Sequence, residues 1–373
     1  MRPALALLLT LPAFSQPAHP TEIFPDPQKF LFWSPQEKPV GFSNIEKIFP
    51  GHEVKRSGAI HSLPYGNELS LPNTTQFMES NNVAGLLIIH DGKIVLERYA
   101  LGFTEKSRWT SFSVAKSFTS TLVGAAVADG SIKSIDDQVT QYLPTLKGTA
   151  YDGVTVRNIL NMSSGVKWNE DYVDPKSDVN SFSLATDQSR GSRLVTFMSK
   201  LPREADPGTK FSYKTGETNL IGEIVIAATR KPLATYLSEK IWSKLGMERD
   251  AFWMTSTDGY EMGGCCLSVT LRDYGRFAHF FLNGAKGVVP PDWTRQATTP
   301  TPFSTDPRGG YGYQWWTGNN GTFFASGIFG QHIDFYPDKK LIVVSLSAWP
   351  SALNADRGRA RSAFLATVYQ AIP

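Results

Sequence analysis

Runs of apolar residues, and the polar residues that interrupt them, divide the chain into predicted elements. Residues 83–102, VAGLLIIHDGKIVLERYALG, predict two strands that meet at Asp91-Gly92, a dipeptide typical of a tight hairpin. The apolar stretch at 109–130 predicts a helix, and Gly130 suits the left-handed residue that often ends one. Shorter helical patterns follow at 155–165 and 218–230.

The C-terminal third of the chain changes character. Residues 267–284 include an amphipathic helical pattern, with apolar side chains at Leu271, Tyr274, Phe277 and Phe281. Strands and turns are predicted between 311 and 349, and a closing helix at 351–372. An early hairpin, central helices and a late meander predict an α/β (α+β) fold. We expect one antiparallel sheet flanked by helices, with an all-helical insertion.

The N-terminus is unlike the rest. Residues 1–15 have a basic start, a short apolar run and the small-x-small sequence Ala13-Phe14-Ser15, which together predict a cleaved signal peptide and export to the periplasm or medium. The alternative, a membrane anchor, is disfavoured because the run is shorter than the roughly 20 residues that span a bilayer. Residues 16–75 are rich in proline and turn residues and predict an irregular extension. The main domain is predicted at 76–373, with its helical subdomain at about 131–235.

Composition narrows the functional classes. The chain has 373 residues, of which 41% are hydrophobic and 19% charged, as in a globular protein. A net charge of +3 without a basic run argues against a nucleic-acid partner. No stretch after the signal peptide reads as a membrane span, and the six histidines form no metal-binding spacing. We therefore expect no cofactor and no metal; the oligomeric state stays open.

The two cysteines are adjacent, at Cys265 and Cys266. Neighbouring cysteines seldom bond, because a normal disulfide geometry is hard to reach between them. Neither cysteine has an evident histidine partner, so a thiol nucleophile is not favoured.

A candidate for chemistry is the S-x-x-K sequence formed by Ser113 and Lys116, at the predicted start of the long apolar helix. Residues three apart share a helix face, and burying an ammonium group in an apolar helix is costly. A lysine kept neutral by burial can remove the proton of a serine and make it a nucleophile. The alternative is a serine that caps a helix, followed by a surface lysine. A second match, Ser164 to Lys167, lies in a glycine turn and is interpreted as chance.

Two further stretches favour the catalytic interpretation of Ser113 and Lys116. In residues 205–225, Tyr213 precedes a turn and an apolar helix, the position in which S-x-x-K hydrolases with a Tyr-x-Asn element carry their tyrosine. Lys214-Thr215-Gly216 spells K-T-G, but it runs into a helix instead of lying on a late strand, so Lys214 is given at most a supporting role. In the late strand, Ser326 and Gly327 are small enough to let the backbone approach a substrate. The alternative there is an ordinary strand with a bulge.

Six stretches carry a resemblance to a known family; in order along the chain they are SVAKSFTS, ILNMSSGVKWNEDY, FSYKTGETNLIG, MGGCCLSVTLRDYGRF, GYGYQWW and SGIFGQ. On these stretches the chain resembles the serine β-lactamase-like hydrolases over about residues 80 to 373. Within them it is most similar to class C β-lactamases, 6-aminohexanoate-dimer hydrolases and their carboxylesterase relatives. The resemblance implies a β-lactamase/transpeptidase-like fold. It also implies Ser113 as nucleophile, Lys116 as base and Tyr213 as proton relay. Tyr172 would bind the substrate amide, and the N–H groups of Ser113 and Ile328 would form the oxyanion hole.

The chain departs from that pattern at two places. Tyr213 is followed by Lys214-Thr215 instead of x-Asn, and Ala325 stands where the late K-T-G or H-T-G has its cation. Both departures favour an esterase or amidase acting on a small-molecule substrate through an acyl-enzyme. The alternatives are a D-Ala-D-Ala peptidase or β-lactamase, and a non-catalytic penicillin-recognising sensor or cell-wall-binding protein.

Overall fold

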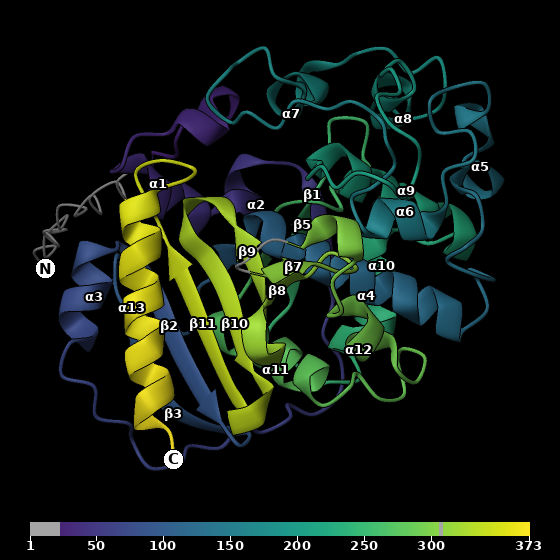
Figure 1. Ribbon diagram of the computed structural model, residues 1–373. Helices are drawn as coiled ribbons and strands as arrows, with labels where there is room; N and C mark the ends of the chain where they lie inside the picture. The colour runs from purple at the N-terminus through teal and green to yellow at the C-terminus, as the bar shows by residue number, and fades with distance from the viewer. Residues whose placement is uncertain (1–22, 306–308) are drawn as a thin grey trace, which may run out of the picture.

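The computed structural model describes residues 23–305 and 309–373, so the predicted signal peptide lies outside the described residues (Figure 1). Within the described residues the main element is a seven-stranded antiparallel sheet of order β3-β2-β11-β10-β9-β8-β7. The predicted hairpin at Asp91-Gly92 joins β2 to β3, and the predicted late meander supplies the other strands. The strands are β2 (Val83–His90), β3 (Lys93–Tyr99), β7 (Gly309–Tyr311), β8 (Trp316–Gly318), β9 (Phe323–Gly327), β10 (Gln331–Tyr336) and β11 (Leu341–Ser347).

Helices cover both faces of this sheet. Leu87 and Ile89 on β2 face the larger core, which includes residues of α4 (Ala115–Ala128) and α11 (Leu271–Leu282). Leu86 and Ile88 face a smaller core, which includes residues of α3 (Thr74–Ser80) and α13 (Ala355–Ala371). Figure 1 shows α13, in yellow, along that face of the sheet. A strand buried on both faces needs a continuous apolar run, which explains the sequence of β2.

A second, four-stranded sheet has the order β1-β5-β6-β4, so the expectation of a single sheet is wrong. Its strands are β1 (Gly51–Val54), β4 (Trp109–Thr110), β5 (Ala251–Met254) and β6 (Leu267–Val269). Strands of two to four residues are too short to show a period-2 pattern. They also pair residues that are far apart in the chain, as Gly51 does with Met254, and no local signal reports such pairing.

The N-terminal segment is more ordered than the predicted irregular extension. It contains a 3₁₀ turn at Pro27–Phe32, α1 (Glu37–Phe42), α2 (Ile45–Ile48) and strand β1. Phe42 is fully buried, and its ring packs against Phe112 at 4.9 Å and Phe329 at 5.5 Å between centroids. The N-terminal segment therefore packs against Phe112 and Phe329, the residues next to Ser113 and Ile328 in the chain.

Residues 131–235 lie beside the large sheet, in teal and green in Figure 1, and every named element in this stretch is helical. The α-helices are α5 (Val139–Tyr142), α6 (Val156–Leu160), α7 (Asp178–Ser181), α8 (Arg193–Met198), α9 (Thr215–Thr229) and α10 (Leu233–Leu237). The long helix α9 packs on α4. One more helix, α12 (Trp293–Ala297), follows α11.

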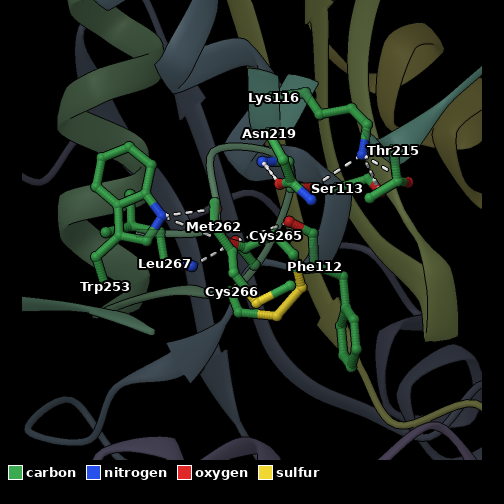
Figure 2. The surroundings of a disulfide bond; sticks show 12 residues. Phe112, Ser113, Lys116, Thr215, Asn219, Trp253, Met262, Cys265, Cys266 and Leu267 are labelled. Carbon is green, nitrogen blue, oxygen red and sulfur yellow. Dashed lines mark hydrogen bonds between the residues drawn. A yellow bond between two sulfur atoms is a disulfide. The ribbon is translucent and has the colours of Figure 1, made fainter. Parts of the chain in front are cut away.

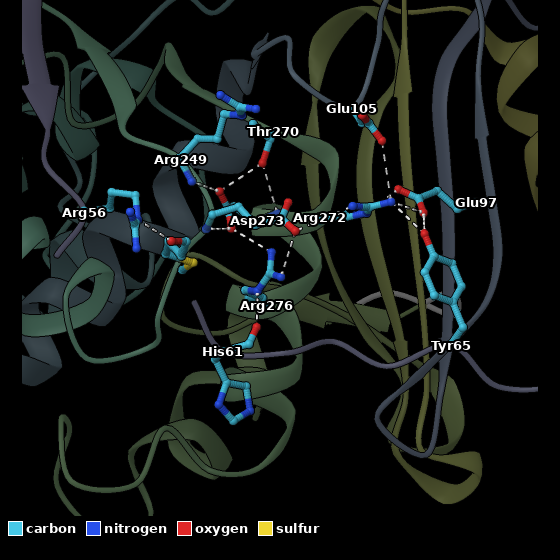
Figure 3. Close-up of polar contacts among 12 residues, drawn as sticks. Arg56, His61, Tyr65, Glu97, Glu105, Arg249, Thr270, Arg272, Asp273 and Arg276 are labelled. Carbon is cyan, nitrogen blue, oxygen red and sulfur yellow. Dashed lines mark hydrogen bonds and ion pairs between the residues drawn. The ribbon is translucent and has the colours of Figure 1, made fainter. Parts of the chain in front are cut away.

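Charged residues of α11 tie this helix to its surroundings (Figure 3). The sequence suggests that Asp273 and Arg272 are helix-surface or capping charges, but Asp273 is only 1% exposed. Its carboxylate accepts hydrogen bonds from Thr270 and Arg276, each at 3.0 Å, and from backbone N–H groups of the turn before β5. Arg272 binds the Glu97 carboxylate on β3 through two nitrogens, at 2.8 and 3.0 Å. These contacts are structural, and they tie α11 to β3 and to the turn before β5.

Candidate active site

Ser113 and Lys116 lie where a short 3₁₀ turn, Phe112–Val114, runs directly into α4. Every residue of α4 from Ala115 to Ala126 is buried, and Lys116 is only 2% exposed. The alternative of a surface lysine after a capping serine is therefore wrong. Burial lowers the pKa of Lys116 from its usual 10.5 to about 8, partly offset by the charge of Glu170.

Polar side chains on this buried helix explain its SFTST sequence. Three hydroxyl groups donate to backbone carbonyls of distant segments: Ser117 to Gln314 at 2.9 Å, Thr119 to Gly263 at 2.6 Å and Ser120 to Tyr313 at 2.7 Å. Each bond satisfies a buried polar group that would otherwise destabilise the fold. Together they fix the helix that carries Lys116 against the rest of the site.

The Nζ atom of Lys116 has three oxygen neighbours (Figure 2). It lies 3.1 Å from Ser113 Oγ, 3.1 Å from Thr215 Oγ1 and 2.9 Å from the carbonyl oxygen of Gly264. An ammonium group would donate to all three. A neutral amine has only two N–H groups and one lone pair, so one of the three neighbours must instead donate to it.

The protons of the neighbours decide which one donates. The Gly264 carbonyl has no proton and can only accept. Thr215 donates its hydroxyl proton to the carboxylate of Glu170, so its oxygen is left to accept from Lys116. The remaining neighbour is Ser113. The lone pair of the neutral amine therefore faces the Ser113 hydroxyl, the arrangement that a general base requires.

Tyr213 lies beside these two groups. Lys116 Nζ lies 5.1 Å from the centroid of its ring, and the Ser113 hydroxyl is close enough to lower the pKa of the phenol. Burial has the larger, opposite effect and raises the pKa of Tyr213 well above its usual value. Of the two groups beside Ser113, Lys116 thus loses its proton at the lower pH. The ring of Trp316 stacks on Tyr213 at 5.5 Å between centroids and walls this side of the site.

Strand β9 passes directly beside the nucleophile. A Cβ atom on Gly327 would lie 3.0 Å from the backbone nitrogen of Ser113 and 2.7 Å from the carbonyl oxygen of Ser111. Only a glycine allows this approach without displacing backbone atoms. Ile328 directly follows Gly327 at the end of β9.

Known proteins resemble this chain in sequence and in fold. The family model described as Beta-lactamase matches residues 73–367. The chain belongs to the Beta-lactamase family. It is 33% identical over 299 residues to the 6-aminohexanoate-dimer hydrolase of Paenarthrobacter ureafaciens, covering 75% of this chain and 76% of the relative.

Solved structures show that the fold is shared. A candidate 6-aminohexanoate-dimer hydrolase from Bacillus anthracis superimposes with a TM-score of 0.80 at 23% identity, covering 88% of this chain and 93% of the other. A penicillin-binding protein from Bacillus halodurans superimposes with a TM-score of 0.63 at 17% identity, covering 79% and 99%. This family member is therefore a serine hydrolase of the β-lactamase and penicillin-binding type, with the β-lactamase/transpeptidase-like fold that the sequence predicts.

Two residues predicted to bind substrate have other partners in this structure. The Tyr172 hydroxyl donates to Glu170 at 2.7 Å, and burial raises the pKa of Tyr172. Ser326 Oγ lies 3.3 Å from Nε2 of His332, a buried residue of β10. Of the three predicted substrate-binding residues, Gly327 is the one placed against the backbone of Ser113.

Lys214 points away from the reacting groups of this family member. Its ammonium is fully buried and lies 3.7 Å from the Glu217 carboxylate, which also accepts from Ser164. The other S-x-x-K match is not a pair, because Ser164 bonds to Glu217 while Lys167 is exposed.

Cys265 and Cys266 are joined by a disulfide, contrary to the expectation that such neighbours stay unbonded (Figure 2). Cys266 has a φ of 69°, so the backbone turns between the two residues and their side chains do not alternate as in a strand. The pair directly follows Gly264, whose N–H donates to Asn219 at 2.7 Å and whose carbonyl accepts from Lys116. The disulfide turn thus adjoins the base.

Three groups at the site have no place in the sequence-based assignment: the Thr215 hydroxyl, the Gly264 carbonyl and the Glu170 carboxylate. Thr215 could have been found, because it stands two residues after Tyr213, where the Tyr-x-Asn element has its asparagine. A backbone carbonyl has no side-chain signature. Glu170 is one of several acidic residues in its loop, and only the fold selects it.

Proposed function

We propose that this serine hydrolase cleaves an amide or ester bond of a small molecule through an acyl-enzyme on Ser113. The observation that carries the proposal is the hydrogen bonding of Lys116. Gly264 and Thr215 take both N–H groups of the neutral amine, so its lone pair faces the Ser113 hydroxyl. A pKa of about 8 keeps an appreciable fraction of that amine neutral near physiological pH.

In the first step, Lys116 takes the Ser113 proton as Oγ attacks the substrate carbonyl carbon. Negative charge develops on the carbonyl oxygen, and the N–H groups of Ser113 and Ile328 stabilise it. One such donor is worth about 2.7–4 kcal/mol in the transition state. The close approach of β9 to Ser113 at Gly327 supports this pairing of two backbone donors.

The leaving group then needs a proton, which Tyr213 delivers. Its high pKa keeps the phenol protonated, and it lies beside both Ser113 and Lys116. The phenol gives its proton to the departing amine or alcohol and recovers one from the Lys116 ammonium. Water then attacks the acyl-enzyme by the same path, releasing the acid and restoring Ser113.

Similarity to a 6-aminohexanoate-dimer hydrolase supports a linear amide as one substrate class to test. Tyr172, Ser326 and Gly327 are proposed to contact the substrate. Ala325 stands where related enzymes carry a cation, which favours substrates without a carboxylate at that place. We also propose that residues 1–15 direct export. Sequencing the N-terminus of the mature protein tests this, and a chain that keeps residues 1–15 would contradict it.

Turnover of three substrates tests the proposal: a short-chain nitrophenyl ester, a 6-aminohexanoate dimer and a chromogenic β-lactam. We expect hydrolysis of the ester or the dimer, and stoichiometric labelling by a serine-directed phosphonate. The Ser113→Ala variant should lose both. Labelling without turnover would favour the sensor alternative, and faster turnover of the β-lactam would favour a β-lactamase. Full activity of Ser113→Ala would overturn the mechanism.

A further inference from the structure

Glu170 lies at the centre of a hydrogen-bonding group that adjoins the base. Its carboxylate accepts from the Trp168 indole, from the Tyr172 hydroxyl at 2.7 Å and from both the N–H and the hydroxyl of Thr215. Trp168 Nε1 and the N–H of Thr215 can only donate, and both bind Oε2 of the carboxylate. Thr215 is the first residue of α9, and its N–H lies 2.8 Å from Glu170 Oε2.

The Thr215 hydroxyl connects this group to Lys116. Its oxygen lies 3.1 Å from Lys116 Nζ, and its proton goes to Glu170. We propose that Glu170 is a positioning residue which, by taking the Thr215 proton, directs the lone pair of Lys116 toward Ser113. The inference rests on the proposed function, in which neutral Lys116 is the base for Ser113.

The alternative orientation of Thr215 shows what Glu170 prevents. A hydroxyl rotor can point its proton at any nearby acceptor, and the lone pair of a neutral amine is a strong one. If Thr215 donated to Lys116, the amine would have to donate an N–H to Ser113. Ser113 would then keep its proton, and the base would be blocked. An ionised carboxylate on the far side of Thr215 makes that orientation unfavourable, because it attracts the proton more strongly.

A simpler reading is that Glu170 only stabilises the start of α9. A carboxylate that accepts an N–H in the first turn of a helix favours the helix electrostatically. This role would affect folding stability, but it gives Thr215 no part in directing the lone pair of Lys116. The two readings therefore differ in the plateau activity of the folded variants and in whether the losses at Glu170 and Thr215 are coupled.

The negative charge of Glu170 has a second measurable effect, on the pH profile of activity. Two effects act on the pKa of Lys116: the negative charge of Glu170 raises it, and burial lowers it. The phenol of Tyr213, which faces Lys116, is neutral. Glu170→Gln removes the negative charge, so the pKa of Lys116 falls. Activity that needs the neutral amine then appears at lower pH. At the same time the plateau falls, because Thr215 no longer has an ionised acceptor. Damage to the fold would lower the Tm as well, whereas the proposal lowers the plateau of a variant that stays folded.

The experiment compares Glu170→Gln, Thr215→Val, the double variant and Thr215→Ser, measuring kcat/KM for a nitrophenyl ester and the rate of phosphonate labelling from pH 5 to 10. We expect the plateau of Glu170→Gln to fall by about tenfold or more, a part of the roughly 10²–10⁴-fold that a general base contributes. Its midpoint should move to lower pH. Thr215→Val should lose a similar factor, the double variant little more, and Thr215→Ser should stay near wild type.

Asp171→Asn is the matched control, since Asp171 is the exposed carboxylate next in the same loop and bonds to Val173 N–H within it. It should leave both the plateau and the midpoint unchanged. An unchanged plateau in Glu170→Gln, or a lower plateau with an unmoved midpoint and a lower Tm, would overturn the proposal. So would fully additive losses in the double variant. Turnover by Ser113→Ala in the same assay would instead overturn the proposed function itself, so the two failures are distinct.

Discussion

The carbonyl oxygen of Gly264 lies 2.9 Å from Nζ of Lys116, across 148 residues of sequence. This bond takes one N–H of the amine and so helps to set the direction of its lone pair. The turn that presents the carbonyl is packed closely. A Cβ on residue 264 would lie 3.0 Å from the Thr215 carbonyl, 3.0 Å from Asn219 Oδ1 and 3.2 Å from Lys116 Nζ.

Gly264→Ala is therefore expected to lower kcat/KM by about tenfold or more, a part of the contribution of a general base. The reason is that backbone and base must both shift to admit the methyl group. Gly358→Ala is the control, because a Cβ there meets nothing within 4 Å and the residue lies in α13. It should keep full activity and gain stability of about 0.5–1 kcal/mol from the better helix propensity of alanine. Equal activity of the two variants would contradict the role given to Gly264.

The pH dependence of kcat/KM reports the base in the free enzyme. Lys116 must be neutral, and its pKa is lowered to about 8. Activity should therefore be low near pH 6, rise through about pH 8 and level off above it. Phosphonate labelling of Ser113 should follow the same curve, since it needs the same proton transfer. A rise centred near 10.5, the usual pKa of lysine, would show that Lys116 is not the titrating base.

Tyr213→Phe tests the proton relay. Removing the phenol hydroxyl takes away the donor to the leaving group, so kcat should fall by roughly the 10²-fold typical of a general acid. The loss should be larger for an amide, whose leaving amine needs a proton, than for a nitrophenyl ester. Tyr311→Phe is the matched control, because Tyr311 is a buried tyrosine whose ring lies 6.0 Å from that of Tyr213. If both variants lost the same factor, the hydroxyl of Tyr213 would have no special role.

Local signals were enough to predict a large part of this molecule. Asp91-Gly92 specifies the hairpin of β2 and β3, and the burial cost of an ammonium pointed to Lys116 before its surroundings were known. The second sheet could not be predicted, because its strands are too short to carry a pattern. Lys116 and Thr215 are 99 residues apart, and Glu170 lies between them, 45 residues before Thr215. Whether such residues meet depends on how α9 packs on α4, which no local pattern encodes.

The disulfide and the burial of Asp273 are two more features that depend on tertiary structure and that local patterns do not predict. Adjacent cysteines are unfavourable on general grounds, and only the turn at Cys266 makes the bond possible. A charged residue near a helix start is most often exposed. Asp273 is buried because backbone N–H groups from a segment about 25 residues earlier point at it, and that partner is set by tertiary structure.

The last prediction concerns stability. Glu223 on α9 is 5% exposed, and burial raises its pKa from 4.5 to about 7, with a hydrogen bond from Ser192 opposing the shift. Between pH 4.5 and 7 the folded protein holds a proton that the unfolded chain has released. The free energy of unfolding therefore falls as pH rises through this window, by about 3 kcal/mol in all. Above pH 7 the full cost of the buried charge is present.

Glu223→Gln removes that cost and keeps an oxygen that can accept from Ser192. The variant should unfold at a higher temperature than the wild type at pH 8, and at nearly the same temperature at pH 4.5, where Glu223 is protonated in the folded protein. Glu79→Gln, at an exposed position on α3, should leave the difference between the two pH values unchanged. Thermal unfolding followed by circular dichroism at both pH values measures it. A gain for Glu223→Gln that is equal at the two pH values would show that the carboxylate is not the source of the pH dependence.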